Sequence, residues 1–367
     1  MKIPFLSFAN MNSGIRAEIL SAFEEFYDNA WYILGRKVSD FEEQYSAFNN
    51  VKHTVGVSNG LDALHLALKI LDVGKGDEVL IPSNTYIASA LAVSYTGATP
   101  VFVEPNARTY NIDPDNIEAL VTSRTKVIMP VHLYGQCCEM EKVMEIAGKN
   151  GLFVIEDNAQ SQGAMYRGKM AGSWGHINGT SFYPGKNLGA LGDAGAITTN
   201  DKQFADRAKT LRNYGSQKKY YNEEIGYNMR LDECQAAFLS IKLKNLDSWN
   251  RERQKIAALY SESLAGLSDL ILPDVASNAT HVFHLYVVRS NKRDELQAHL
   301  TKRDIGTLIH YPIPIHLQDA YKFMNFKAGN FPIAEAIAKT CLSLPIWPGM
   351  TEGEVEYIID AIKDFHK

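Results

Sequence analysis

The chain has 367 residues, of which 46% are hydrophobic and 22% charged, with a formal net charge of -5 and a pI near 6.1. This length and composition fit a globular protein of two domains with a large core. The acidic balance offers no basic surface for nucleic acid or anionic lipid, and no apolar run is long enough to cross a bilayer. Because Met1–Phe5 contains a proline and polar residues follow, we expect no signal peptide and a cytoplasmic enzyme.

Short apolar segments alternate with helical patterns through the first part of the chain. Strands are expected at 51–57, 78–81, 100–103, 127–131 and 153–155, and helices at 60–71, 87–95 and 139–149. This alternation predicts the α/β class, with a mainly parallel sheet covered on both faces by helices. Polar clusters follow four of the strands, at 58–60, 83–86, 132–135 and 156–157, at the edge where such sheets bind ligands.

The pattern changes near residue 232. From Asp232 to about Leu264 it predicts one long helix or two joined helices that bridge two domains. A smaller α/β domain is then indicated by a strand at 282–288, a helix near 294–303 and helices near Ile333 and Glu352. We therefore expect a large domain at 1–245 and a small one at 246–367.

The cysteine and histidine spacings do not predict a metal site. Cys137, Cys138, Cys234 and Cys341 have neither metal-ligand spacing nor the pattern of a disulfide framework. His281 and His284 have a spacing that suggests a metal, but in the strand expected there they would face opposite sides, which favours a structural role.

Lys186 lies in a glycine-rich segment, Ser181–Gly195, directly after an apolar strand-like run. A protonated lysine is a poor nucleophile, but an imine with pyridoxal 5'-phosphate removes that difficulty, and the released amine can move protons afterwards. An isolated lysine is usually a surface residue. The adjacent proline and glycine and the apolar flanks favour a functional lysine here.

Asp157 follows the apolar run Leu152–Ile155, and a carboxylate at the end of a buried strand needs a partner. A protonated pyridine nitrogen would serve and would keep the cofactor ring electron-withdrawing. A helix cap or a metal ligand is the alternative interpretation. Gln160, three residues on, could hydrogen-bond the phenolic oxygen of the ring.

The segment Ser58–Leu64 joins a strand to a helix through a polar turn that contains Gly60, and a helix start favours an anion such as phosphate. Many α/β turns share this pattern. Ser181 could add a hydroxyl to the same site. Tyr86 follows another strand and could stack on the pyridine ring, although an isolated tyrosine is more often a core or surface residue.

Taken together, these motifs resemble the DegT/StrS family of nucleotide-sugar aminotransferases, which have the fold type I architecture of pyridoxal phosphate enzymes. The resemblance runs almost from end to end. It is closest to the subgroup of dTDP-3-oxo-6-deoxyhexose 3-aminotransferases. The motifs that carry it are 58–60, 82–86, 130–135, 156–160, 181–195 and 226–237.

The resemblance implies a role for each matching residue. Lys186 would be the Schiff-base lysine and Asp157 the partner of the pyridinium. Asn228 would reach the phosphate from the neighbouring subunit, which implies a homodimer with shared sites. Some relatives carry histidine at the lysine position and perform dehydration, so Lys186 favours transamination. The remaining cofactor contacts would be Tyr86 on the ring, Gln160 on the phenolic oxygen, and Gly60, Leu61 and Ser181 around the phosphate.

The segments Arg212–Tyr220 and Ile309–Gln318 look like those of the subgroup that acts on carbon 3 of the sugar. A diphosphate is suited to basic side chains, and a sugar to rings that stack or hydrogen-bond, so that a large nucleotide supplies binding energy far from the reacting carbonyl. A solvated loop for the lysines and a core position for His310 stay open. The candidates are Arg212, Lys218 and Lys219 for the diphosphate, and Tyr183, Tyr221, His310 and Tyr311 for the sugar.

The expected reaction moves the amino group of L-glutamate to carbon 3 of a dTDP-3-oxo-6-deoxyhexose and gives a dTDP-3-amino-3,6-dideoxyhexose. The alternatives are transfer to carbon 4 of a UDP- or dTDP-4-keto-6-deoxy sugar, and a pyridoxal phosphate dehydratase. An idle homologue that acts as a sensor or an assembly subunit is the alternative outside enzymes.

Overall fold

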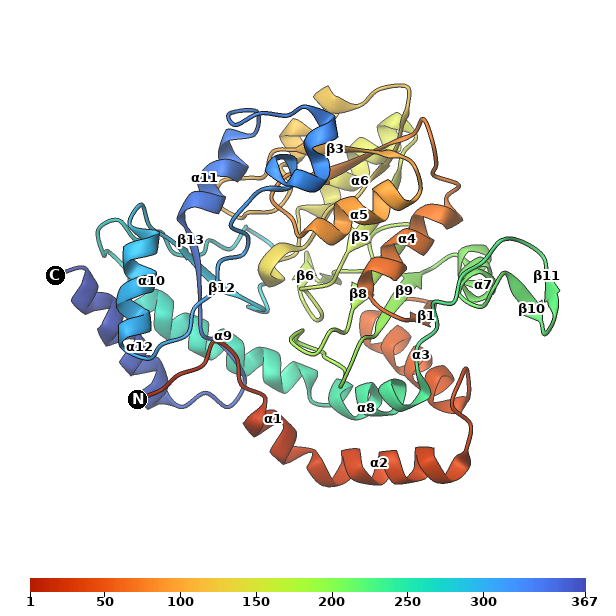
Figure 1. The fold of residues 1–367 in the computed structure, drawn as a ribbon, viewed down its shortest axis with the longest axis horizontal. Coiled ribbons are helices and arrows are strands. Elements are labelled where there is room, and N and C mark those ends of the chain that lie inside the picture. Colours follow the sequence, from red (N-terminus) through yellow and green to blue (C-terminus); the bar gives the residue numbers. More distant parts are fainter.

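The computed structural model describes residues 1–367 and is built around one seven-stranded sheet (Figure 1). The strand order is β1-β9-β8-β5-β4-β2-β3, and all strands run parallel except β9, which is antiparallel to both neighbours. This confirms the mainly parallel sheet. The strands are β1 (His53–Val57), β2 (Glu78–Pro82), β3 (Thr99–Val103), β4 (Thr125–Ile128), β5 (Phe153–Asp157), β8 (Ile177–Ser181) and β9 (Gly195–Thr199).

Alternate residues of these strands enter two separate cores, one on each face of the sheet, as the period of two in a β-strand requires. Val79 and Ile81 join a cluster with the helices on one face, whereas Leu80 joins a cluster that includes Val143 of α6 on the other. The sheet is therefore buried on both sides. The helices of this part are α3 (Arg36–Asn49), α4 (Gly60–Ile70), α5 (Ile87–Tyr95), α6 (Met140–Asn150), α7 (Lys202–Leu211) and α8 (Glu233–Leu243).

The segment from residue 232 to 264 forms two helices, α8 and then α9 (Leu246–Ser263), which leads away from the sheet (Figure 1). Ile256 and Tyr260 of α9 pack into a further core, separate from the two on the faces of the sheet, and Ile3 also joins it. The division at residue 245 stays a prediction. The other elements of the C-terminal part are β12 (Tyr286–Arg289), α10 (Arg293–Lys302), α11 (Pro332–Thr340), β13 (Cys341–Leu344) and α12 (Glu352–Phe365).

Three expected strands are shorter than predicted, and the first of them, expected at 51–57, begins at His53. The strand expected at 282–288 begins only at Tyr286, because the N–H of Val282 donates to the carbonyl of Gly135 and this segment lies against the loop after β4. The strand expected at 127–131 ends at Ile128. Pro130 has no N–H to donate, and Val131 keeps only an isolated bridge to Asp157.

The N-terminal helices α1 (Ala9–Gly14) and α2 (Arg16–Asn29) lie along one edge of the molecule, and no residue of α2 is buried (Figure 1). Short hairpins are formed by β6 (Met165–Tyr166) with β7 (Lys169–Met170) and by β10 (Ser216–Lys218) with β11 (Tyr221–Asn222). None of the helices combines the length and the apolar character that a membrane span requires.

Candidate active site

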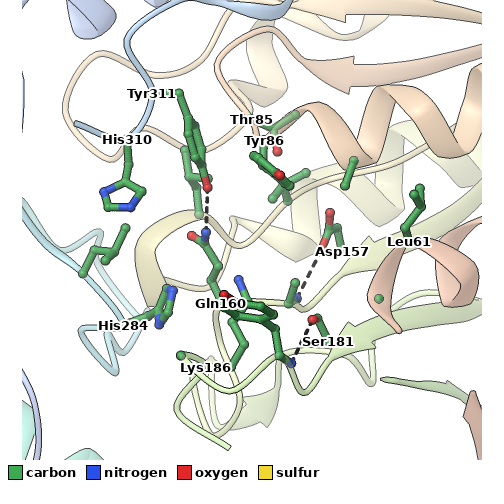
Figure 2. Close-up of a pocket in the computed structure, with 18 of the residues that line it drawn as sticks. Leu61, Thr85, Tyr86, Asp157, Gln160, Ser181, Lys186, His284, His310 and Tyr311 are labelled. Carbon is green, nitrogen blue, oxygen red and sulfur yellow. Dashed lines mark hydrogen bonds between the residues drawn. The ribbon is translucent and has the colours of Figure 1, made fainter. Parts of the chain in front are cut away.

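A cavity of about 680 Å³ opens where the carboxyl ends of β1, β2, β5 and β8 meet the C-terminal part of the chain. In Figure 2, Asp157 and Leu61 lie on one side of this space and His284 and His310 on the other. The cavity brings together ten of the residues predicted from the sequence. These are Gly60, Leu61, Tyr86, Asp157, Gln160, Ser181, Tyr183, Lys186, His310 and Tyr311.

Lys186 reaches the cavity from the loop after β8. Its backbone N–H closes a turn onto the carbonyl of Tyr183 at 2.8 Å. The neighbouring Asn187 is buried and fixes the loop, because its Nδ2 donates to Asn250 Oδ1 at 2.8 Å and to the carbonyl of Val282 at 3.1 Å. Burial lowers the pKa of Lys186 to about 8, although the Asp157 carboxylate opposes this shift. The amine therefore loses its proton far more easily than an ordinary lysine.

Asp157 ends β5 and is buried. Its carboxylate accepts hydrogen bonds from the hydroxyl of Ser89 at 2.8 Å and from the N–H of Ala159 at 3.1 Å. Burial raises the pKa of Asp157, and these hydrogen bonds oppose that rise. A buried carboxylate without an ion-pair partner is costly, so the site suits a ligand that brings a positively charged N–H.

The start of α4 forms a cradle of backbone N–H groups. The side chain of Asn59 caps the helix by accepting from the N–H of Asp62 at 2.8 Å, whereas no carbonyl of the chain accepts from the N–H of Gly60 or Leu61. A Cβ atom on Gly60 would lie 2.5 Å from Cβ of Ser181, so only glycine allows this approach. Free N–H groups at a helix start beside a serine hydroxyl suit a phosphate.

Two tyrosine rings lie in the upper part of Figure 2, and the amide of Gln160 lies below the ring of Tyr311. The rings of Tyr86 and Tyr311 have centroids 5.2 Å apart and are inclined at 37°. Gln160 donates from Nε2 to the hydroxyl of Tyr311 at 3.1 Å, and its Oε1 accepts from the N–H of Tyr134 at 2.6 Å. These bonds fix the side chain of Gln160, and Nε2 keeps one hydrogen for a ligand. Tyr86 is 54% exposed, which leaves ring surface for stacking.

The cavity also contains residues that the sequence interpretation did not assign to it, among them Phe5, Leu6, Arg253 and His284. They come from the N-terminus, from α9 and from the segment before β12. No local sequence pattern connects such distant positions. Only the packing of the two parts of the chain could reveal them.

His284 was interpreted as structural because a strand was expected around it. His281 is buried but His284 lines the cavity, and the described residues contain no group of three His, Cys, Asp or Glu side chains that could hold a metal. His284 Nδ1 lies 3.2 Å from Asn187 Oδ1. Because Nδ2 of Asn187 donates elsewhere, its Oδ1 must accept, so Nδ1 carries the hydrogen and Nε2 is a free acceptor. Burial, together with the charge of Lys186, holds the pKa of His284 far below its ordinary value.

Five of the candidate residues lie outside this cavity. Lys218, Lys219 and Tyr221 are exposed in the β10–β11 hairpin, which projects from the side of the molecule next to α7 (Figure 1). Asn228 is exposed and pairs with Asn213. The prediction for Arg212 is wrong, because this side chain is buried and bound to Glu42 at 2.5 Å and to the carbonyl of Gly56 at 2.6 Å. Its charge is therefore neutralised inside the core, away from the cavity.

The sheet, the covering helices and the smaller C-terminal part define the fold type I class of transferases, as the sequence predicted. The model of the DegT/DnrJ/EryC1/StrS aminotransferase family matches residues 13–363, and the chain belongs to this family. Over 99% of both chains it is 53% identical to the dTDP-3-amino-3,6-dideoxy-alpha-D-galactopyranose transaminase of Aneurinibacillus thermoaerophilus.

Solved structures agree with this assignment. The crystal structure of DesV from S. venezuelae in complex with a ketimine intermediate has a TM-score of 0.98 and 46% identity, and the match covers 100% of this chain and 99% of that one. The structure of NtdA from Bacillus subtilis with bound cofactor PMP has a TM-score of 0.93 and 30% identity, with 99% of this chain and 85% of that one covered.

Proposed function

We propose that the protein is a pyridoxal phosphate-dependent aminotransferase that moves the amino group of L-glutamate to carbon 3 of a dTDP-3-oxo-6-deoxyhexose. The observation that carries this proposal is the cavity that holds Lys186, Asp157 and the cradle at the start of α4 together. The name of the relative from Aneurinibacillus thermoaerophilus supports carbon 3 of a dTDP sugar as the acceptor.

The residues present fit the cofactor. Lys186 would bind it covalently through Nζ, Asp157 would hold the ring nitrogen, and Tyr86 would stack on the ring. Gln160 has a hydrogen of Nε2 left for the phenolic oxygen. The free N–H groups of Gly60 and Leu61, with the Ser181 hydroxyl, would hold the phosphate. When bound, pyridoxal phosphate supplies an electron sink for negative charge on a substrate carbon.

The chain itself supplies the proton transfers. Since the pKa of Lys186 lies at about 8, its Nζ can both accept and donate a proton near neutral pH. Asp157 keeps a negative charge at the other end of the site when a positive N–H pairs with it. Most of the residues that line the cavity are apolar, so a bound substrate would displace water from the space between these two groups.

The sugar would contact Tyr183, His310 and Tyr311, which all line the cavity. We assign Asn228, Lys219 and Tyr221 to the site of a neighbouring subunit, because these exposed residues do not line the cavity of their own chain. The protein would then be a homodimer with shared sites. In support, α2 and the segment after it expose a run of large apolar side chains, the kind of surface that marks an interface: Leu20, Phe23, Tyr27, Trp31, Tyr32 and Ile33.

Subunit mixing tests the shared site. Lys186→Ala and Asn228→Ala are each expected to lose activity, but a mixed dimer would contain one site with both residues intact. Random reassociation of equal amounts should therefore restore activity to about a quarter of the wild-type value. If Asn228 acts on the site of its own chain, the mixture stays as inactive as its components.

The reaction itself is tested by offering L-glutamate with dTDP-linked 3-oxo and 4-oxo sugars in parallel. We expect an amino sugar only from the 3-oxo substrate, identified by mass and by the position of the new nitrogen in NMR spectra. Amination of the 4-oxo sugar alone would replace the proposal by the carbon-4 alternative. Loss of water without nitrogen transfer would indicate a dehydratase.

A further inference from the structure

Arg253 of α9 is a buried cation at the wall of the cavity and is only 2% exposed. Its Nη1 donates to the carbonyl of Ile346 at 2.9 Å, with longer contacts to the carbonyls of Phe283 and His284 at 3.4 and 3.5 Å. No carboxylate forms an ion pair with it, although fifteen other arginine and lysine side chains of the chain reach one within 3.5 Å. The guanidinium charge is thus left without a counter-charge.

The remaining nitrogens of Arg253 differ from each other. Nε is sealed from solvent and has no hydrogen-bond partner. Nη2 makes no hydrogen bond within the chain either, but it is not among the sealed atoms, so it is the nitrogen left to meet a ligand in the cavity that Arg253 lines. Burial lowers the pKa of Arg253 to about 10, which still leaves it protonated at neutral pH. A buried charge of this kind is costly unless a ligand neutralises it.

The surroundings of Arg253 show what kind of anion would fit. Asn187, the neighbour of Lys186 in the chain, lies 3.2 Å from the ring of His284, and Nη1 of Arg253 lies 3.5 Å from the carbonyl of His284, so Lys186 and Arg253 both approach the cavity beside His284. The nearby wall is apolar: Phe5, Leu6 and Ile346 line it, and Leu6 also packs on the core of the C-terminal part. A cation beside an apolar wall and close to Lys186 suits a short aliphatic acid. It suits a diphosphate poorly, because a diphosphate needs several donors.

We propose that Arg253 binds a carboxylate of the amino donor through Nη2 and so fixes the donor beside Lys186. This proposal rests on the proposed function, since it takes an amino acid to be the nitrogen source. The apolar wall would cover the methylene groups of the donor and raise the strength of the ion pair by excluding water. The sugar nucleotide, in contrast, would not depend on Arg253.

The test measures the two half-reactions separately by the absorbance of the bound cofactor. Arg253→Met should raise the KM for L-glutamate about 10- to 100-fold, as expected for losing a charge-assisted hydrogen bond, with a smaller change in kcat. The half-reaction with the amino sugar should change less than about threefold. Arg253→Lys, which keeps a charge but loses the planar fork, should lie between the wild type and Arg253→Met.

Gln254→Met is the matched control. Gln254 is the next residue of α9 and also donates to a carbonyl before β12, that of His281 at 3.0 Å, but it does not line the cavity. Removing this amide in Gln254→Met should leave the KM for glutamate unchanged. If Arg253 only held the backbone in place, both half-reactions would weaken together in its variants, and the inference would be wrong.

Calorimetry with glutarate, which has two carboxylates but no amine, gives a second readout on the holoenzyme. Wild type and Gln254→Met should bind it, and Arg253→Lys should bind it several-fold more weakly. Equal binding by folded Arg253→Lys would overturn the inference even if Arg253→Met does not fold. A wild-type enzyme that does not react with glutamate at all would instead overturn the proposed donor, so the two failures are distinguishable.

Discussion

The hydroxyl of Ser89, in α5, donates a hydrogen bond of 2.8 Å to Oδ2 of Asp157 at the end of β5. Ser89 is itself fully buried, and its oxygen lies 3.1 Å from the hydroxyl of Thr85. This contact holds the carboxylate in one orientation without placing a cation in direct contact with it. A ligand that enters the cavity can therefore use Asp157 without having to break an ion pair.

Ser89→Ala should weaken cofactor binding. Removing the hydroxyl raises the pKa of Asp157 further, because burial then acts with one opposing hydrogen bond fewer. A hydrogen bond to a charged group contributes about 1.5–3 kcal/mol, so we expect a Kd for pyridoxal phosphate about tenfold higher or more. Fluorescence titration of the cofactor-free protein measures this. Ser94 also lies in α5 but contacts the hydroxyl of Tyr321 instead, so Ser94→Ala should bind the cofactor as the wild type does.

The covalent capture of pyridoxal phosphate should depend on pH through Lys186. Its pKa is lowered to about 8, so the reactive free amine gains about tenfold per pH unit below that value and saturates above it. The second-order rate of cofactor capture by the cofactor-free protein should rise from pH 6 and level off near pH 8. A rise that continues towards pH 10 would show an ordinary lysine, and stopped-flow absorbance distinguishes the two curves.

Asn187→Ala should lower kcat by about tenfold with a smaller effect on cofactor affinity. It would remove the bonds to Asn250 and Val282 that fix the loop of Lys186, and small displacements of a reacting group are costly. The matched control is Asn245→Ala, which loses a bond to the carbonyl of Ile241 away from this loop. Equal kcat values for the two variants would contradict the positioning role of Asn187.

Gly60→Ala should release the cofactor. The added Cβ would lie 2.5 Å from Cβ of Ser181, so the cradle must open and its N–H groups move apart. Gly148 lies within α6 with open space around its Cβ position, and Gly148→Ala serves as the control. The concentration of pyridoxal phosphate needed for half-saturation should rise only in the first variant, as equilibrium dialysis would measure.

The sequence predicted most of the site because its residues follow strands whose order can be read from their alternation with helices. Asp157, Tyr86, Gly60 and Lys186 all come from such strand ends. The contributions of Phe5, Arg253 and His284 were not predicted, because they depend on how the C-terminal part packs on the sheet.

Prediction also failed where a charged side chain pairs with another residue of the chain and not with a ligand. Arg212 has the charge that a diphosphate needs, but Glu42 in α3 pairs with it in the core. The sequence does not reveal which anion a basic residue binds, since either a ligand or a buried carboxylate can neutralise it. Only the folded structure identifies that partner.

The most direct measurement is borohydride reduction of the purified protein with its cofactor, followed by peptide mass spectrometry. Our account predicts that the cofactor mass is attached to the peptide that contains Lys186, and that Lys186→Ala loses both this label and transamination. A label on any other lysine, or full activity in Lys186→Ala, would contradict it.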